Sequence, residues 1–143
     1  MLKTQAIQSQ FRELPFERIA GVPDYVTIVN QQNFRYKIDL RTCYWNSRLD
    51  VEHQRVFDAL RQRPDQFVLD GTGGVGPFAL PLARRGLNVL TNDLNGACFR
   101  LVQENIRLNR LDDQRVWCAN CDAIDLLRRF LVEKFCVPEG RVY

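Results

Sequence analysis

Apolar and polar residues alternate near the start of the chain, in YVTIV (25–29) and FRYKIDL (34–40), on either side of the turn-like NQQN. This alternation predicts an antiparallel β-hairpin that packs one face against the rest of the protein. Residues 1–24 show little periodicity and contain two prolines, so we expect a linker or extension there. A hairpin region, 25–46, then precedes a main domain over 47–143.

From residue 47 onward, helical patterns alternate with short apolar runs. The first helix is expected from Ser47, as its cap, to about Arg63. Three apolar runs follow, each typical of a buried parallel strand and each leading into a helix. The strands are FVLDG (67–71), LNVLTND (87–93) and RVWCANCDA (115–123), and the helices are 77–85, a segment capped by Asn95, and 123–135. Successive βα units predict an α/β, Rossmann-like fold with a parallel sheet and right-handed crossovers.

A glycine-rich turn, DGTGGVGPF (70–78), lies between the first of these strands and its helix. Its glycines let the backbone approach a ligand closely, although tight turns also use glycine for purely steric reasons. Asp93 ends the next strand, 23 residues after Asp70. That is near the spacing of about 20 at which an acidic side chain meets a ribose hydroxyl, so we expect an adenosine-bearing ligand.

The carboxylate of Asp70 at the mouth of the turn narrows the choice of ligand. It would oppose a pyrophosphate but suits the ammonium and sulfonium groups of S-adenosylmethionine, directly or through water. Asp122, at the end of the third strand, is placed to meet the adenine amino group. A dinucleotide and a merely structural turn are the alternatives.

Composition and charge add little to this picture. The 143 residues are 45% hydrophobic with a net charge of +3, which indicates one modest globular domain. No signal core or bilayer-spanning run is present, so we expect no membrane contact and a cytoplasmic protein, or a nuclear or mitochondrial one in a eukaryote. Seventeen arginines against three lysines suit contacts with RNA phosphates and bases, but a bias of the source genome explains the excess equally well.

The cysteines and the single histidine are expected to pack rather than to carry chemistry. Five cysteines form an odd, scattered set, which favours reduced thiols over a disulfide framework. Cys118 and Cys121 form a CxxC pair, but the chain has no second such pair and only His53 beside it, so a zinc site lacks ligands. We expect His53 to pack or to be solvated.

Several segments together resemble the tRNA (guanine-N1)-methyltransferases of the archaeal and eukaryotic type, a Met-10+ like family of class I methyltransferases that modify the guanine immediately 3′ of the anticodon. The resemblance runs from about Phe11 to Ala123. The matching pieces, in the family's order, are YWNSRLDVEH (44–53), DGTGGVGPF (70–78), TNDLN (91–95), ENIRLN (104–109) and NCDA (120–123).

The resemblance implies S-adenosylmethionine as cofactor and tRNA as the partner of the full-length protein. It places the glycine-rich turn around the methionine end of the cofactor, and Asp93 and Asp122 at the ribose and the adenine. The cofactor-binding residues so implied are Asp70, Gly71, Gly73, Gly74, Gly76, Phe78, Asp93, Leu94, Asn95, Asp122 and Ala123.

The resemblance also implies catalytic residues. Guanine N1 carries a proton near neutral pH and must lose it before it attacks the methyl group. Glu52 matches the family's general base, and Arg48 and Tyr44 match positions beside the target base. Arg12 matches a further catalytic arginine. An arginine there would stabilise negative charge on the neighbouring carbonyl oxygen.

Each of these residues also has a structural interpretation. Arg48 and Glu52 lie four residues apart on a predicted helix and suit a surface ion pair. Tyr44 and Trp45 suit stacking on a flipped base, but they suit anchoring of the hairpin to the core equally well.

The chain departs from the family after its third recognisable parallel strand. The asparagine-proline loop of the fourth strand and the small amino-terminal domain have no counterpart. We therefore expect a truncated piece, the amino-terminal half of the methyltransferase domain, inactive by itself. The strand FVLDG would then have an unpaired edge, so we expect self-association through it or coverage by the hairpin.

Two other functions stay open. A sister family, the tRNA-wybutosine enzymes that transfer the cofactor's aminocarboxypropyl group, resembles the chain around the glycine-rich turn, but Arg48 with Glu52 favours methyl transfer. The third reading is a non-catalytic module that binds RNA or a protein through an arginine-rich face.

Overall fold

The computed structural model describes residues 2–3, 11, 16–17, 19–60, 66–111 and 115–132. Arg12 lies outside these residues, as do the expected ends of the first helix and of the last. Two short strands near the amino terminus, β1 (Leu2–Lys3) and β2 (Phe16–Glu17), pair antiparallel within the segment expected to be a linker.

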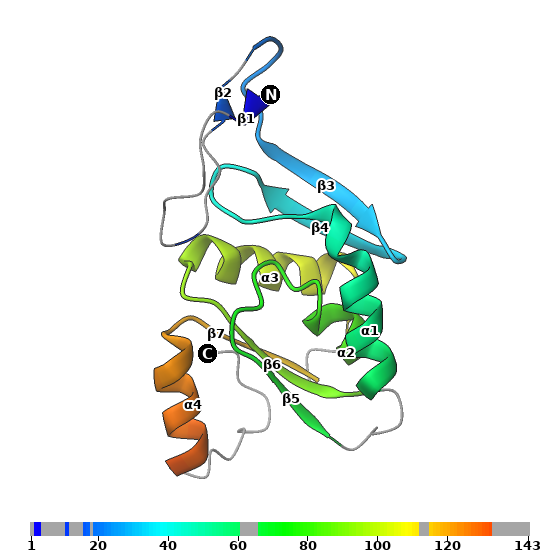
Figure 1. The fold of residues 1–143 in the computed structure, drawn as a ribbon, viewed down its shortest axis with the longest axis vertical. Helices are drawn as coiled ribbons and strands as arrows, with labels where there is room; N and C mark the ends of the chain where they lie inside the picture. The colour runs from blue at the N-terminus through cyan, green and yellow to red at the C-terminus, as the bar shows by residue number, and fades with distance from the viewer. Residues whose placement is uncertain are drawn as a thin grey trace.

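The expected hairpin is confirmed as β3 (Val26–Gln31) and β4 (Phe34–Asp39), paired antiparallel (Figure 1). Its two-residue turn places Gln32 at φ 49° and Asn33 at φ 63°. Left-handed conformations at both turn positions match the right-handed twist of the strands, which is why a two-residue loop closes the hairpin here. One face of β4 is buried, as expected.

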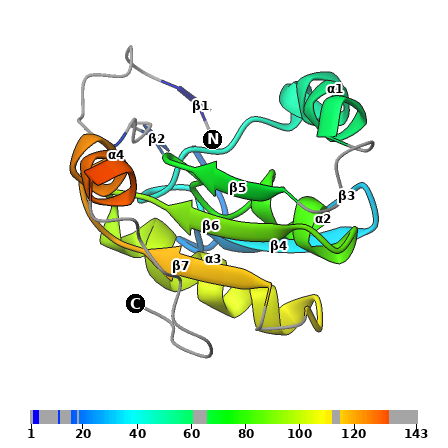
Figure 2. The same cartoon turned by 90° about the horizontal axis from the view of Figure 1, so that it is seen from below.

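The main domain contains a three-stranded parallel sheet in the order β5-β6-β7 (Figure 2). The strands are β5 (Phe67–Asp70), β6 (Asn88–Asn92) and β7 (Val116–Ala119). Both pairings are parallel, so the carboxyl ends of all three strands meet at one edge of the sheet. The expected α/β, Rossmann-like architecture, a parallel sheet preceded along the chain by an antiparallel hairpin, is confirmed.

The first helical segment begins differently from the expectation. Asn46, not Ser47, is the cap, because its side chain accepts a hydrogen bond from the backbone N–H of Arg48 at 3.0 Å. A 3-10 turn, η1 (Ser47–Leu49), comes first and α1 (Asp50–Leu60) follows it.

The remaining helices are α2 (Ala79–Arg84), α3 (Gly96–Leu108) and α4 (Ala123–Val132). Asn95 caps α3, as expected, by accepting a hydrogen bond from Ala97 N at 2.9 Å. In Figure 1, α3 lies between the hairpin and the parallel sheet. The face of α3 that carries Cys98, Leu101, Val102 and Ile106 is buried, which confirms the helical spacing found in the sequence.

The edge strand β5 is half-buried along its whole length, which corrects the expectation of a buried strand. The reason is its position: β6 pairs with it on one side only in the described part of the chain. The hairpin does not cover this edge, because β4 lies against α3 and the hairpin forms a separate sheet. The expectation that the hairpin covers the edge of β5 was therefore wrong.

Candidate active site

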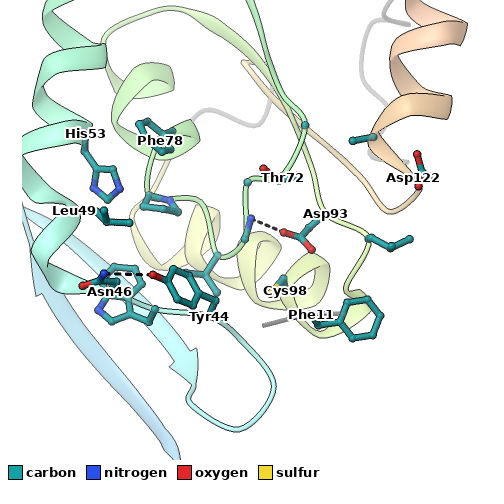
Figure 3. Close-up of a pocket in the computed structure, with 18 of the residues that line it drawn as sticks. Phe11, Tyr44, Asn46, Leu49, His53, Thr72, Phe78, Asp93, Cys98 and Asp122 are labelled. Atoms are coloured by element: carbon teal, nitrogen blue, oxygen red, sulfur yellow. Dashed lines mark hydrogen bonds between the residues drawn. The ribbon is translucent and has the colours of Figure 1, made fainter. Parts of the chain in front are cut away.

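A cavity of about 640 Å³ opens at the carboxyl ends of the parallel strands (Figure 3). Its volume is in the range of small-molecule sites. One wall consists of the glycine-rich turn and the residues after β6 and β7, and the other of the segment that leads from the hairpin into α1. The lining residues are Phe11, Tyr44, Trp45, Asn46, Leu49, His53, Gly71, Thr72, Gly73, Gly74, Val75, Pro77, Phe78, Asp93, Leu94, Cys98, Asp122, Ala123 and Ile124.

Two glycines of the turn serve different purposes. A Cβ on Gly73 would collide with the Thr91 hydroxyl and lie 2.9 Å from Asp70 Oδ2, so the absence of a side chain there lets the turn pack on β6. Gly74 has a φ of +56°, and a Cβ on it would meet nothing within 4 Å. Steric packing therefore explains Gly73, whereas Gly74 presents open backbone on the cavity wall.

Asp93 holds the turn in place from the end of β6. Its Oδ2 accepts a hydrogen bond from Gly74 N at 2.8 Å (Figure 3), and its Oδ1 accepts one from Asn95 N at 2.9 Å. Each carboxylate oxygen keeps a second lone pair, so the side chain can still accept hydrogen bonds from a ligand. The turn and the amino terminus of α3 are thus fixed by one acidic group that also lines the cavity.

Asp70 lies beneath the turn and does not line the cavity. Its Oδ2 is buried without a hydrogen-bond partner among the described residues. The pKa of Asp70 is raised to about 6. Burial is the main cause and the nearby charge of Asp93 adds to it, while a backbone hydrogen bond from Thr72 acts in the opposite direction. A buried carboxylate oxygen without a partner, next to a ligand-sized cavity, fits a site that receives a cation or a water-bridged amine.

The third strand contributes Asp122 and Ala123 to the far end of the cavity. Asp122 Oδ1 accepts a hydrogen bond from Ile124 N at 2.7 Å and so caps α4. Leu94 lines the cavity, whereas Gly76 and Asn95 do not. Asn95 supports the wall from behind through its cap of α3 and a hydrogen bond from its Nδ2 to Thr42 O.

The opposite wall is aromatic and mostly apolar. Tyr44 lines it, and the Tyr44 hydroxyl accepts a hydrogen bond from Asn46 Nδ2 at 3.3 Å (Figure 3). Trp45 both lines the cavity and packs against Tyr36 of the hairpin, with ring centroids 5.2 Å apart. The anchoring interpretation therefore holds for Trp45, alongside its place in the wall.

His53 was expected to pack or to be solvated, and with 4% of its surface exposed it packs. Its ring meets the edge of Phe78, with centroids 4.5 Å apart, and both residues line the cavity. Burial lowers the pKa of His53, against the smaller opposing effects of Asp50 and Glu52. The imidazole is therefore neutral near pH 7.

Glu52 and Arg48 are exposed and do not line the cavity. Glu52 pairs with Arg55, not with Arg48: Arg55 donates from its guanidinium to the two carboxylate oxygens at 2.6 and 2.8 Å. The ion pair expected between Arg48 and Glu52 is thus absent from the described ion pairs, since Arg48 belongs to η1 rather than to α1. The hydrogen bond from Arg55 lowers the pKa of Glu52, so this carboxylate is ionised near neutral pH.

The two cysteines of the CxxC pair lie in β7 and directly before the lining residue Asp122. Cys118 is buried in β7, and the thiol of Cys121 donates to Asn92 Oδ1 at 3.4 Å. Cys43 and Cys121 are free cysteines, and Cys98 is buried like Cys118. Within the described ranges, no group of three or more histidine, cysteine or acidic residues could hold a metal ion.

Sequence reasoning missed several lining residues, among them Phe11, Leu49, Val75 and Cys98. These residues are apolar, and an apolar residue in a cavity wall has the same sequence signature as one in the core. Leu49 and His53 are four residues apart in a segment that the sequence predicts to be helical, which was a weak signal that both point the same way.

The chain matches a family model described as the TRM5/TYW2 methyltransferase domain over residues 27–136. A tRNA (guanine(37)-N(1))-methyltransferase of Danio rerio is 41% identical over 126 residues, which are 88% of this chain and 26% of the relative. A tRNA (guanine(37)-N(1))-methyltransferase of Entamoeba histolytica is 36% identical over 136 residues, which are 95% of this chain and 34% of the relative. The chain thus spans about a quarter to a third of the length of these relatives.

A solved structure of Methanocaldococcus jannaschii Trm5 in complex with adenosine resembles the fold with a TM-score of 0.71 and 27% sequence identity. The likeness covers 81% of this chain and 35% of that chain. None of the described helices is long and apolar enough to cross a membrane. The family model covers most of the sequence, including the hairpin, the glycine-rich turn and all three parallel strands. The chain therefore belongs to the TRM5/TYW2 methyltransferase domain family.

Proposed function

We propose that this chain carries the cofactor-binding part of an S-adenosylmethionine-dependent tRNA (guanine37-N1)-methyltransferase. The observation that carries the proposal is the cavity at the carboxyl ends of β5 to β7, where Asp93 fixes an open backbone turn. The names of the relatives and the adenosine bound to one solved neighbour support the same ligand class.

The cavity and the carboxylate buried beneath its glycine-rich turn fit the proposed cofactor in three respects. Gly74 presents backbone with no side chain to fill the ligand space, and Asp93 keeps free lone pairs for ribose hydroxyls. Asp70 Oδ2, buried beneath the turn without a partner among the described residues, would supply negative charge to the cationic end of the cofactor directly or through water. Asp122 at the far end of the cavity suits the adenine. When bound, S-adenosylmethionine supplies an electrophilic methyl group on a sulfonium.

The protein's own residues would prepare the guanine. We propose that Tyr44, on the aromatic wall, contacts the target base, and that Arg48 stabilises negative charge on its carbonyl oxygen. Glu52 takes the proton from guanine N1. Because Arg55 donates to both carboxylate oxygens of Glu52 in this structure, the ion pair between them must open when the substrate binds. Arg12 is proposed as a further catalytic arginine.

The first experiment measures cofactor binding. Isothermal titration calorimetry of the purified chain with S-adenosylhomocysteine should show one site. Replacing Asp93 with Ala removes the acceptor of Gly74 N and Asn95 N and should weaken binding by about a hundredfold, since two backbone hydrogen bonds and the ribose contact are lost together. No heat with the wild-type chain would contradict the enzyme reading and favour a non-catalytic module.

The second experiment identifies the transferred group. Full-length protein is incubated with a tRNA transcript and with S-adenosylmethionine labelled in the methyl group or, separately, in the aminocarboxypropyl carbons. Methyl label in 1-methylguanosine supports the proposal. Aminocarboxypropyl label would favour the wybutosine-type reaction, the second candidate because the family model covers both classes.

The role of Glu52 is tested with a matched acid on the same helix. Glu52→Gln should lower the rate of transfer by about a hundredfold or more, whereas Asp58→Asn, another exposed acid of α1, should leave it unchanged. Equal rates in the two variants would remove Glu52 from the mechanism.

The proposal extends to partners and compartment. Full-length protein is proposed to bind tRNA, and the half-paired strand β5 to mediate self-association when nothing else covers it. The free thiols of Cys43 and Cys121 suit a reducing compartment such as the cytoplasm.

A further inference from the structure

Two buried asparagines, Asn105 within α3 and Asn109 at its carboxyl-terminal cap, lie where the helix faces strand β4 of the hairpin (Figure 1). Asn105 is 0% exposed and Asn109 is 8% exposed, so both amides are removed from water. They are four residues apart, which places them one turn apart on the same helical face. Buried amides of this kind require hydrogen-bond partners.

The two amides bind β4 in the same way. Asn105 Oδ1 accepts from Lys37 N at 2.7 Å and its Nδ2 donates to Lys37 O at 3.1 Å. Asn109 Oδ1 accepts from Arg35 N at 2.8 Å and its Nδ2 donates to Arg35 O at 2.7 Å. The asparagines thus take the place of a neighbouring strand along the free edge of β4.

Of the two side-chain amides, only that of Asn105 also bonds to a residue outside both the hairpin and α3. Its Nδ2 also donates to Val75 O at 3.1 Å, whereas the second bond of Asn109 Nδ2 goes to Asn105 O within α3 itself. Val75 lines the cavity and directly follows Gly74, whose N–H is held by Asp93. The amide of Asn105 therefore joins the hairpin to the glycine-rich turn.

The two structures that Asn105 joins lead to opposite walls of the cavity. The glycine-rich turn forms the wall that receives the cofactor. Strand β4 runs on through Cys43 into Tyr44, Trp45 and Asn46, which form the aromatic wall. The Asn105 side chain donates two hydrogen bonds and accepts one, and through them it connects the two walls.

We propose that Asn105 is a positioning residue that sets the distance between the cofactor wall and the aromatic wall. The proposal rests on the proposed function, because it takes S-adenosylmethionine as the ligand. This positioning role is distinct from holding β4 against α3. The Asn109 amide also holds β4, but it does not contact the glycine-rich turn.

Asn109 provides the matched control. Asn105→Asp and Asn109→Asp each keep the shape and the acceptor but remove the donor of one amide, so each loses a bond to β4 and a second bond. Both should lower the unfolding temperature to a similar extent. Binding of S-adenosylhomocysteine, measured by calorimetry below both transitions, should weaken by about tenfold in Asn105→Asp and by less than about twofold in Asn109→Asp.

Two results would overturn the inference: wild-type affinity in Asn105→Asp, or an equal loss in both variants. Absence of binding in the wild-type chain would instead count against the proposed function, so the two failures are distinguishable.

Amide hydrogen exchange tests the same coupling without a variant, in case Asn105→Asp does not fold. Addition of S-adenosylhomocysteine to the wild-type chain should slow exchange at the Lys37 N–H, which Asn105 holds, more than at the Arg35 N–H, which Asn109 holds. Equal slowing at the two amides, or none at Lys37, would refute the role of Asn105.

Discussion

The two faces of the parallel sheet are packed to very different depths. On the face toward α2 and α3, one cluster of buried residues runs from Val89 and Val116 of the sheet to Phe34 and Tyr36 of the hairpin. On the opposite face, the described buried cluster consists of Leu90, Ala119 and Leu126. The hairpin thus adds a further layer to one face, whereas α4 is the only helix on the other among the described residues.

The thin face also leaves apolar side chains in water. On α4, Ile124, Leu131 and Val132 are 61%, 71% and 79% exposed. Because buried apolar area is the main source of folding free energy, the α3 side should stabilise the domain far more than the α4 side. The cavity lies between them: its glycine-rich turn rests on the thick layer, and Asp122 and Ala123 rest on the thin one.

The largest expected effect comes from the thick face. Leu80 of α2 is 0% exposed and packs next to Gly76 of the turn. Leu80→Ala should lower the free energy of unfolding by about 3 to 4 kcal/mol, because the cavity it leaves cannot collapse in a closely packed layer. Urea denaturation measures the loss, and a value below about 1 kcal/mol would contradict the comparison.

A smaller effect is expected from Asp70, at the end of the edge strand. Its pKa of about 6 in the folded chain exceeds the ordinary value of 3.8, so the folded state binds its proton more tightly than the unfolded state does. Stability should therefore fall as the pH rises from about 4 through 6, by at most about 3 kcal/mol. Asp70→Asn should remove this slope in denaturation curves between pH 4 and 8, and an unchanged slope would show that Asp70 is ionised in both states.

The thin face should tolerate the same truncation better. Leu126 of α4 is 5% exposed, but its neighbours include half-buried and exposed side chains. We expect Leu126→Ala to lower the free energy of unfolding by about 1 to 2 kcal/mol, since surrounding groups and water can fill the space. A loss equal to that of Leu80→Ala would show that the two faces contribute alike.

The smallest effect is expected from an exposed residue of the same helix. Leu131→Gln changes a side chain that is 71% exposed and keeps good helix propensity, so stability should change by less than about 0.5 kcal/mol. Thermal unfolding followed by circular dichroism measures it. A larger destabilisation would mean that Leu131 packs against a part of the chain or a partner that stabilises α4.

Much of the fold follows from local patterns. From residue 25 onward, the hairpin, the order of strands and helices and the cap at Asn95 were predicted correctly, because alternation, helical spacing and capping are properties of neighbouring residues. The short strands β1 and β2 were not predicted, because they pair residues far apart in a segment without periodicity. The start of the first helix was wrong by one cap residue, because Asn46 and Ser47 are both good caps and it is the side chain of Asn46 that accepts the hydrogen bond from Arg48 N.

The candidate site was predictable in part for the same reason. Gly74, Asp93 and Asp122 line the cavity, as expected from the turn and the strand ends, and Tyr44 lines it as the family resemblance implied. Asp70 does not, because the turn folds over its carboxylate, and Glu52 faces Arg55 because η1 changes the helical phase between residues 48 and 52.

By itself, the sequence determined which segments form strands and helices, the parallel order of βα units and the acidic strand ends, since each depends on residues close together in the chain. Only the tertiary structure decided which amide on α3 joins the hairpin to the glycine-rich turn, and which face of the sheet is deeply packed. Those relations bring together residues as distant as Lys37, Val75 and Asn105, and a buried polar group shows its role only when all of its hydrogen-bond partners are in place.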